Sequence, residues 1–229
     1  MDRLKIIAHI HTDFPDKFGI PRQSGLCPEA IGIIRFEGEF KDALYVKGME
    51  DFSHLWLLWE FEDVKRENAS PLVRPPRLGG NETRGVFATR SPFRPNPIGL
   101  SSVRLEKIEY TNDGPLLYVS GIDLRDNTPI FDIKPYLSYA DSHPEAKDGF
   151  AGEKFSDNLE VVFSQELLNS IPENKQSTLM EVLAEDPRPH YQNDPDRVYG
   201  LFFAGFNIKF KVEDKVLTVI STERLKNES

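Results

Sequence analysis

Residues 101–136 carry the sequence SSVRLEKIEYTNDGPLLYVSGIDLRDNTPIFDIKPY. Runs of β-branched, aromatic and aliphatic residues occupy positions 101–110, 116–122 and 130–136, and Asn, Asp, Gly and Pro fill the gaps between them. Short runs of this kind, separated by residues that favour turns, are typical of β-strands. We therefore expect three consecutive strands in this stretch.

Four more runs of the same kind precede it, at residues 4–12, 30–36, 55–61 and 85–89. Within the first 140 residues, no long segment has apolar positions at helical spacing, which argues against an alternating parallel α/β fold. Many short strands without intervening helices indicate a sandwich or a barrel. The sequence therefore predicts a mainly β fold.

A domain boundary is expected where this strand pattern ends and polar residues accumulate, near residues 141–145. Beyond it the sequence predicts a strand, a helical segment and a hairpin, at residues 159–163, 167–183 and 199–222. The strands of that hairpin are expected at 199–212 and 216–222. We divide the chain into residues 1–142 and a small α+β part, residues 143–229.

The composition is that of a cytoplasmic protein. Cys27 is the only cysteine, which excludes an intramolecular disulfide and a cysteine zinc cage and suits a reducing compartment. The N-terminus reads as a first strand rather than a signal peptide, and no apolar run approaches the roughly 18 residues of a membrane span. No sequence pattern activates Cys27 as a nucleophile, so we expect a packed thiol.

Charge is distributed unevenly along the chain. The net charge is −9, yet residues 65–104 hold eight basic residues against two acidic ones, a net +6, so the rest sums to −15. Such a polarised chain can present one positive face to nucleic-acid phosphates. The alternative is that these arginines form separate surface ion pairs.

Four longer strings carry a resemblance to a known family: GIPRQSGL (19–26), GMEDFSHLWLLWEF (48–61), RPPRLGGNETRGVFATRSPFRPNPIGLSS (74–102) and DLRDNTPIFDIKPYLSYADS (123–142). Because these four strings occur in the order and at the spacing of that family, the chain resembles the TrmO-type (YaeB or TsaA-like) tRNA methyltransferases. The resemblance implies a single-sheeted N-terminal β-barrel that binds S-adenosylmethionine, a smaller C-terminal domain that positions tRNA, and a homodimer. It also implies N6-methylation of N6-threonylcarbamoyladenosine next to the anticodon.

The resemblance also assigns residues to the cofactor, namely Pro21, Arg22, Gln23, Glu62, Asp63, Arg90, Leu100, Asp123, Leu124, Arg125 and Asp126. Arg90 follows the run at 85–89, so we expect its guanidinium at a strand end, where it can hold the cofactor's carboxylate. For Asp123 and Asp126 the alternative is a turn whose carboxylates bond their own backbone. Glu62 and Asp63 are variable in the family, which leaves their backbone as the alternative contact.

No general base is evident. The leaving group of a sulfonium needs no protonation, so positioning the adenine N6 atom against the methyl group supplies most of the acceleration. Two proline-rich loops, at 70–80 and 91–99, are pre-shaped because proline fixes φ. Arg94 and Asn96 in the second loop are the candidate catalytic residues, expected to orient the nucleobase.

The tRNA anticodon loop is the expected partner. Arg66, Arg74 and Arg77 are its candidate contacts in the basic stretch, and Arg188 and Tyr191 are the candidates in the C-terminal part. Those last two lie in DPRPHY (186–191), which also resembles the family. The alternative for this loop is that an Asp–Arg ion pair pins it.

Two other functions stay open. His9 and His11 share one face of the first expected strand, as in metal-dependent hydrolases, although the other histidines have no recognisable ligand spacing and no metal site is predicted. A non-catalytic RNA- or nucleotide-binding barrel is the second alternative. Trp56 and Trp59 fall on opposite faces of their strand, so at most one can stack on a ligand.

Overall fold

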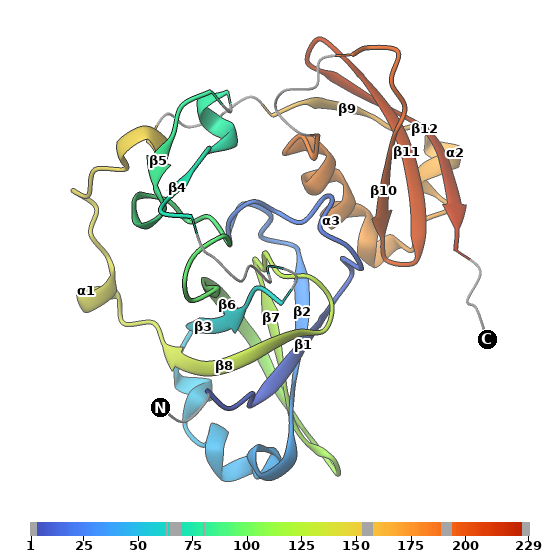
Figure 1. The fold of residues 1–229 in the computed structure, drawn as a ribbon. Helices are drawn as coiled ribbons and strands as arrows, with labels where there is room; N and C mark the ends of the chain where they lie inside the picture. Colours follow the sequence, from blue (N-terminus) through green and yellow to red (C-terminus); the bar gives the residue numbers. More distant parts are fainter. Residues whose placement is uncertain are drawn as a thin grey trace.

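The computed structural model describes residues 4–62, 64, 70–79, 81–152, 158–188 and 194–225. Its largest element is a closed barrel of six antiparallel strands in the order β1-β2-β7-β6-β3-β8 (Figure 1). The strands are β1 (Ala8–Thr12), β2 (Ile31–Phe36), β3 (His54–Glu60), β6 (Ile98–Thr111), β7 (Gly114–Ser120) and β8 (Thr128–Pro135). Strand β1 pairs with both β2 and β8, which closes the sheet and leaves no free edge. The predicted mainly β fold with a single-sheeted barrel is confirmed.

Alternation along the strands fills the barrel. In β3, Leu55, Leu57 and Trp59 are buried, whereas Trp56 and Leu58 between them are only partly buried. This period of two is what the pleat of a strand requires when one face lines a core. The two tryptophans therefore do lie on opposite faces.

The expected strand at 85–89 is wrong. Only Gly85 of this run belongs to a strand, the two-residue β5 (Arg84–Gly85), which pairs with β4 (Leu72–Val73). The next residues form a 3-10 turn, η5 (Val86–Ala88), because Thr89 donates both its amide and its hydroxyl to the carbonyl of Val86. A side chain that bonds the nearby backbone competes with extended structure.

The remaining short elements lie between the barrel strands or after β8. They are η1 (Gly38–Lys41), η2 (Ala43–Val46), η3 (Met49–Asp51), η4 (Pro76–Leu78), α1 (Ser138–Asp141) and η6 (Gly149–Ala151). Within the described ranges, no helix combines the length and the apolar character that crossing a bilayer requires.

The C-terminal part is a four-stranded sheet with two helices. Its sheet order is β10-β11-β12-β9, in which β9 pairs parallel to β12. The elements are β9 (Glu160–Val162), α2 (Gln165–Leu168), α3 (Glu173–Ala184), β10 (Tyr199–Phe203), β11 (Phe206–Glu213) and β12 (Val216–Arg224). This arrangement is the predicted small α+β part.

Two details of the C-terminal prediction are wrong. The expected first hairpin strand is two strands, because Ala204 and Gly205 both take positive φ and turn the chain between β10 and β11. The expected single helical segment is broken before Pro172, which precedes α3. The turn expected at residues 213–215 is present, with Asp214 at a φ of 51°.

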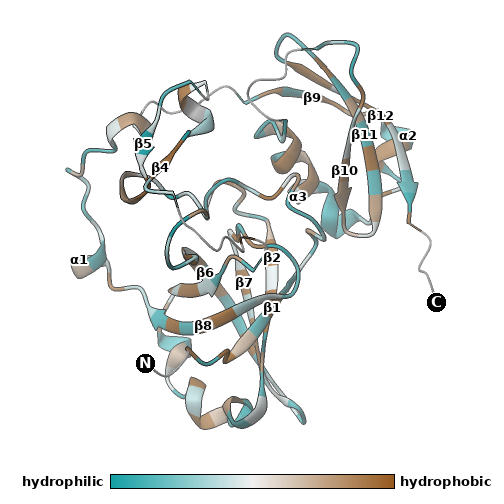
Figure 2. Cartoon of the chain, viewed as in Figure 1, coloured by the Kyte–Doolittle hydropathy of each residue, from teal (hydrophilic) through white to brown (hydrophobic). Residues whose placement is uncertain are grey.

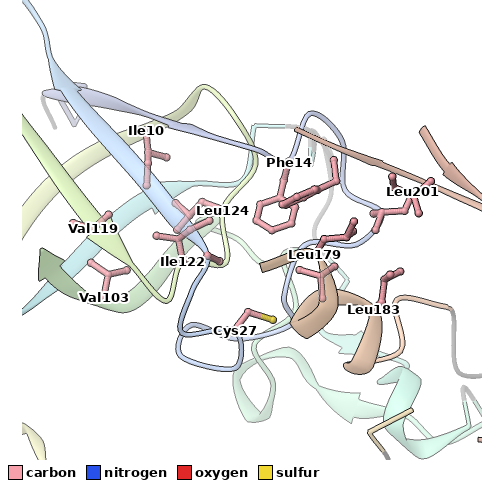
Figure 3. Packing of buried hydrophobic residues seen from close by; sticks show 14 of the residues in the cluster. Ile10, Phe14, Cys27, Val103, Val119, Ile122, Leu124, Leu179, Leu183 and Leu201 are labelled. Carbon is pink, nitrogen blue, oxygen red and sulfur yellow. The ribbon is translucent and has the colours of Figure 1, made fainter. Parts of the chain in front are cut away.

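The connection between β1 and β2, residues 13–30, joins the barrel to the C-terminal part. Figure 3 shows Phe14 between Leu124 of the barrel region and Leu201 of β10, with the buried Cys27 near α3. The rings of Phe14 and Phe203 are 5.5 Å apart, and Figure 2 shows β10 mostly in hydrophobic colours. The core thus runs through both parts, and burial raises the pKa of the Cys27 thiol to about 12. The division of the chain after Ser142 stays a prediction.

Candidate functional site

A cavity of about 880 Å³ lies where β3 and β6 meet the β1–β2 connection and the loop that follows η5. Its apolar lining includes Trp59, Phe61, Phe87, Phe93 and Leu100. Charged side chains from Lys17, Arg22, Glu62, Arg90, Asp123 and Arg125 share the same walls. A cavity of this size, with apolar walls and a few convergent charges, is typical of a small-molecule site.

The cavity brings together most of the residues predicted from the sequence. Ten of them line it: Pro21, Arg22, Gln23, Glu62, Arg90, Leu100, Asp123 and Arg125 from the cofactor set, and Arg94 and Asn96 as the candidate catalytic residues. These residues come from four separate stretches of sequence, and barrel closure makes them neighbours.

Of the other three predicted cofactor residues, two do not line the cavity. Leu124 is 1% exposed in the core, and its carbonyl accepts a hydrogen bond from the Thr12 hydroxyl. The Asp126 carboxylate accepts from the Thr12 amide at 3.0 Å, which fastens the β7–β8 connection to β1 and not to its own turn. Asp63 lies outside the described residues. The cofactor roles of all three stay predictions.

Asp123 is a carboxyl group of the cavity with a clearly shifted pKa. The Ser101 hydroxyl donates to Asp123 at 2.5 Å, and the Trp59 indole donates to Ser101 at 2.9 Å. Burial raises the pKa of Asp123 to about 6, although the Ser101 bond and the nearby Arg90 charge oppose this rise. The carboxyl is therefore ionised at neutral pH but close enough to titration to respond to what binds beside it.

Arg90 lies at the exposed rim of the cavity. It follows η5 rather than a strand, so the expected strand-end position is wrong. Its guanidinium nevertheless lines the cavity and donates to the side-chain oxygen of Gln23. Across the cavity, Arg125 and Glu62 form a looser ion pair of 3.8 Å.

The loop carrying Arg94 and Asn96 is fastened to the end of β3. The Phe61 amide donates to the carbonyl of Pro97 at 2.9 Å, and the Ile98 amide donates to that of Asn96 at 2.7 Å. Arg94 donates to the carbonyl of Thr89 at 3.3 Å. These bonds give the loop one shape at the cavity mouth.

Sequence reasoning missed the aromatic lining and the pair that supports Asp123. Phe87, 78% exposed, and Phe93 project from the loop region, while Trp59 and Ser101 lie behind Asp123. Gly99, which pairs with Trp59 across β3 and β6, was expected in the loop 91–99, so no sequence signal pointed to this close approach.

Only some of the predicted RNA contacts lie within the described residues. Arg74 is exposed near η4, whereas Arg66, Tyr191 and the side chain of Arg77 lie outside the described part of the chain. Arg188 is 8% exposed and forms two hydrogen bonds with the Asp186 carboxylate, at 2.8 and 2.9 Å. The Asp–Arg ion pair of the alternative interpretation is present.

His9 and His11 point to the outer side of β1, where each meets a different carboxylate. The His9 ring nitrogen is 2.7 Å from Glu37, and that of His11 is 3.3 Å from Asp126. Within the described ranges, no group of three or more His, Cys, Asp or Glu side chains is arranged to hold a metal ion.

Comparison with known proteins agrees with this geometry. The family model of the tRNA-methyltransferase O N-terminal domain matches residues 9–142, and that of the TrmO C-terminal domain matches residues 156–225. A protein of Escherichia coli (strain K12) named tRNA (adenine(37)-N6)-methyltransferase is 40% identical over 95% of this chain and 96% of its own length. One of the same name from Eikenella corrodens is 47% identical over 71% of this chain and 92% of its own.

A solved structure shows the same fold. The crystal structure of TrmO from Pseudomonas aeruginosa superposes with a TM-score of 0.78 and 32% identity, covering 97% of this chain and 99% of the other. Family models that together span most of the chain, and a relative of nearly equal length, lead to one assignment. The chain belongs to the tRNA-methyltransferase O (TrmO) family.

Proposed function

We propose that this protein is an S-adenosylmethionine-dependent tRNA methyltransferase that methylates N6 of adenosine 37, beside the anticodon. Its substrate nucleoside is N6-threonylcarbamoyladenosine. One observation carries the proposal: in a member of the TrmO family, a single cavity gathers eight of the eleven expected cofactor residues with both candidate catalytic residues. The names of the relatives supply the reaction class.

The cavity fits the chemistry of the cofactor. S-adenosylmethionine has a carboxylate, an ammonium, a ribose, an adenine and a sulfonium, and when bound it supplies an electrophilic methyl group. Arg22 and Arg90 offer cations for the carboxylate, and Asp123 and Glu62 offer acceptors for the ammonium and the ribose hydroxyls. The aromatic lining is suited to the adenine face.

The residues at the cavity mouth hold the nucleobase. Arg94 and Asn96 lie on a loop with a fixed shape. Their side chains therefore orient the base without the loop losing conformational entropy at each turnover. Asp123, ionised at neutral pH, keeps negative charge in the cavity beside a cationic cofactor. Exclusion of water by the aromatic side chains strengthens this attraction.

We propose a homodimer as the working unit, a cytoplasmic location where tRNA is found, and a tRNA-positioning role for residues 143–229. Exposed apolar side chains support a partner: Tyr139 after β8 is 87% exposed and Phe87 beside the cavity is also largely exposed.

The experiment that tests the function combines binding and product analysis. Calorimetry with S-adenosylmethionine should show binding and calorimetry with zinc should not. Incubation with S-adenosylmethionine and tRNA that carries N6-threonylcarbamoyladenosine should add one methyl group to that nucleoside, seen by mass spectrometry. Zinc binding alone would favour the hydrolase, and binding of tRNA without methyl transfer would favour the non-catalytic barrel.

A further inference from the structure

Arg22 belongs to the cavity wall and also contacts the C-terminal part. Its Nη2 atom donates to the main-chain carbonyls of Asp186, at 2.9 Å, and Arg188, at 3.2 Å. These residues are more than 160 positions away in sequence. The same arginine lines both the large cavity and a second cavity of about 270 Å³.

The loop that Arg22 contacts has an unusual internal construction. Asp186 takes a φ of 48°, in the left-handed region that costs energy for most residues other than glycine. Its carboxylate accepts the Nε and Nη2 atoms of Arg188 and also the Arg188 amide, at 3.2 Å. This ring of bonds holds the loop so that two carbonyls converge on one guanidinium.

Burial separates Arg188 from the solvent. Only 8% of the residue is exposed, and the hydrogen bonds to Asp186 raise the pKa of its guanidinium, which therefore stays charged although it is buried. With Nε and Nη2 bonded to Asp186 and the residue buried, little of the guanidinium is accessible to a phosphate. Arg188 therefore acts on the shape of the loop.

The helix that precedes the loop, α3, is docked on the same connection. Lys175 forms an ion pair of 2.5 Å with Asp13, and the Thr178 hydroxyl donates to the carbonyl of Glu29 at 2.8 Å. These bonds fix α3 at both ends of residues 13–30. Arg22 lies between them and reaches past the end of α3 to the loop itself.

We propose that Arg22 is a positioning residue that docks the loop of residues 185–188 against the wall of the cofactor cavity, and that Arg188 shapes this loop through Asp186 instead of binding RNA phosphate. The catalytic consequence rests on the proposed function. Whatever occupies the cavity acts on the same guanidinium that holds the loop, so cofactor binding and loop docking are thermodynamically linked.

Hydrogen–deuterium exchange on the cofactor-free protein tests the docking without any activity. Arg22→Met and Asp186→Asn should each speed amide exchange in residues 185–188 by about tenfold or more, while exchange in β3 and β6 stays slow. Asn tolerates positive φ, so Asp186→Asn removes the ionic clip without straining the turn. Arg90→Met is the matched control, because it removes a guanidinium from the same cavity that bonds Gln23 and not the loop.

Exchange in residues 185–188 that is unchanged in Arg22→Met would overturn the docking. A rise equal to that in Arg90→Met would also overturn it, because a general loosening of the cavity would then explain the result. Failure of the wild-type protein to methylate tRNA would sink the proposed function and leave this exchange result standing.

Kinetics at saturating S-adenosylmethionine tests the consequence. Arg22→Met and Arg188→Met should each lower kcat/KM for tRNA by about tenfold, and the double variant should lose no more than either alone, because both remove one docked loop. Losses that multiply in the double variant would contradict the proposal. Arg188→Met should leave the salt dependence of tRNA affinity unchanged, whereas a slope lower by about one would make Arg188 a phosphate contact.

Discussion

Arg90 donates to Gln23 at the rim of the cavity, where a ligand carboxylate can take over or share the guanidinium. We expect Arg90→Met to weaken S-adenosylmethionine binding by about 2 kcal/mol, or about 30-fold in Kd, because a charge-assisted partner is lost at a partly desolvated site. Calorimetry measures the change. Arg74→Met, an exposed arginine that does not line the cavity, is the control and should bind normally. An unchanged Kd in Arg90→Met would remove this residue from the cofactor site.

The buried carboxyl of Asp123 makes stability depend on pH. Its pKa rises from 3.8 in the unfolded chain to about 6 in the folded one, so the folded state binds more protons between these values. Stability therefore falls as pH rises from about 4 to about 6, by about 3 kcal/mol in total, since one pKa unit corresponds to about 1.4 kcal/mol. Asp123→Asn mimics the protonated form and should lose this decline.

Urea unfolding of the cofactor-free protein at pH 4 and pH 7 measures the effect. The stability of Asp123→Asn relative to wild type should increase between the two pH values. Parallel pH dependences in the two proteins would show that the Asp123 carboxyl titrates normally in the folded state.

At the residue scale, the sequence indicated which residues belong to the cavity but not which way their side chains point. Motif resemblance placed ten residues that do line one cavity. It did not distinguish Asp123, which faces the cavity, from Asp126, which bonds Thr12, because the conformation of the β7–β8 connection decides which way each carboxylate points. The support of Asp123 by Ser101 and Trp59 depends on strand register, which a single sequence does not reveal.

Where β3 pairs with β6, the ring of Trp59 packs closely against Gly99. A Cβ atom at Gly99 would lie 2.2 Å from the ring of Trp59, so Gly99→Ala must displace the indole that donates to Ser101. We expect a loss of about 1–3 kcal/mol in unfolding free energy, as overpacking in a core usually costs, with a change in tryptophan fluorescence. Gly85→Ala is the control, because a Cβ there meets nothing within 4 Å. Equal stabilities of the two variants would contradict this contact.

At the element scale, the pattern of short β-branched and aromatic runs between turn-forming residues located the six barrel strands. It failed at residues 85–89, where an apolar run is held in a turn by Thr89 and Phe87 faces solvent. It also failed at the turn between β10 and β11, where Ala204 beside Gly205 takes a positive φ that is uncommon for alanine. At residues 85–89, local hydrogen bonding to the backbone overrode composition.

For the whole molecule, the proposed homodimer gives a direct expectation. Light scattering at micromolar concentration should return a mass of about 52 kDa, twice the 26.2 kDa of one chain. Replacing the exposed Tyr139 by Ser should shift the equilibrium towards monomer if the segment after β8 is in the interface. A mass near 26 kDa for the wild-type protein would refute the dimer.

The last expectation concerns how a chain of net charge −9 binds a polyanion. The basic stretch 65–104 has a net charge of +6, although Arg84 is already paired with Glu82 at 2.8 Å. If about four to six phosphates are neutralised there, tRNA affinity should fall with salt at a log-log slope of magnitude about 3 to 5. Binding measured from low to moderate salt gives this slope directly.

Charge reversals decide whether the stretch carries the contact. Reversing Arg66, Arg74 or Arg77 to Glu should lower the slope by about one each. S-adenosylmethionine affinity should stay intact, and Arg74 gives the structural reason, because it does not line the cavity. Lys107→Glu on β6 is the control, because Lys107 lies outside residues 65–104 and forms an ion pair of 3.0 Å with Glu109. If reversing all three arginines changed neither affinity nor slope, the stretch would be an ordinary solvated surface. The RNA would then have to bind through the C-terminal part, against its negative charge.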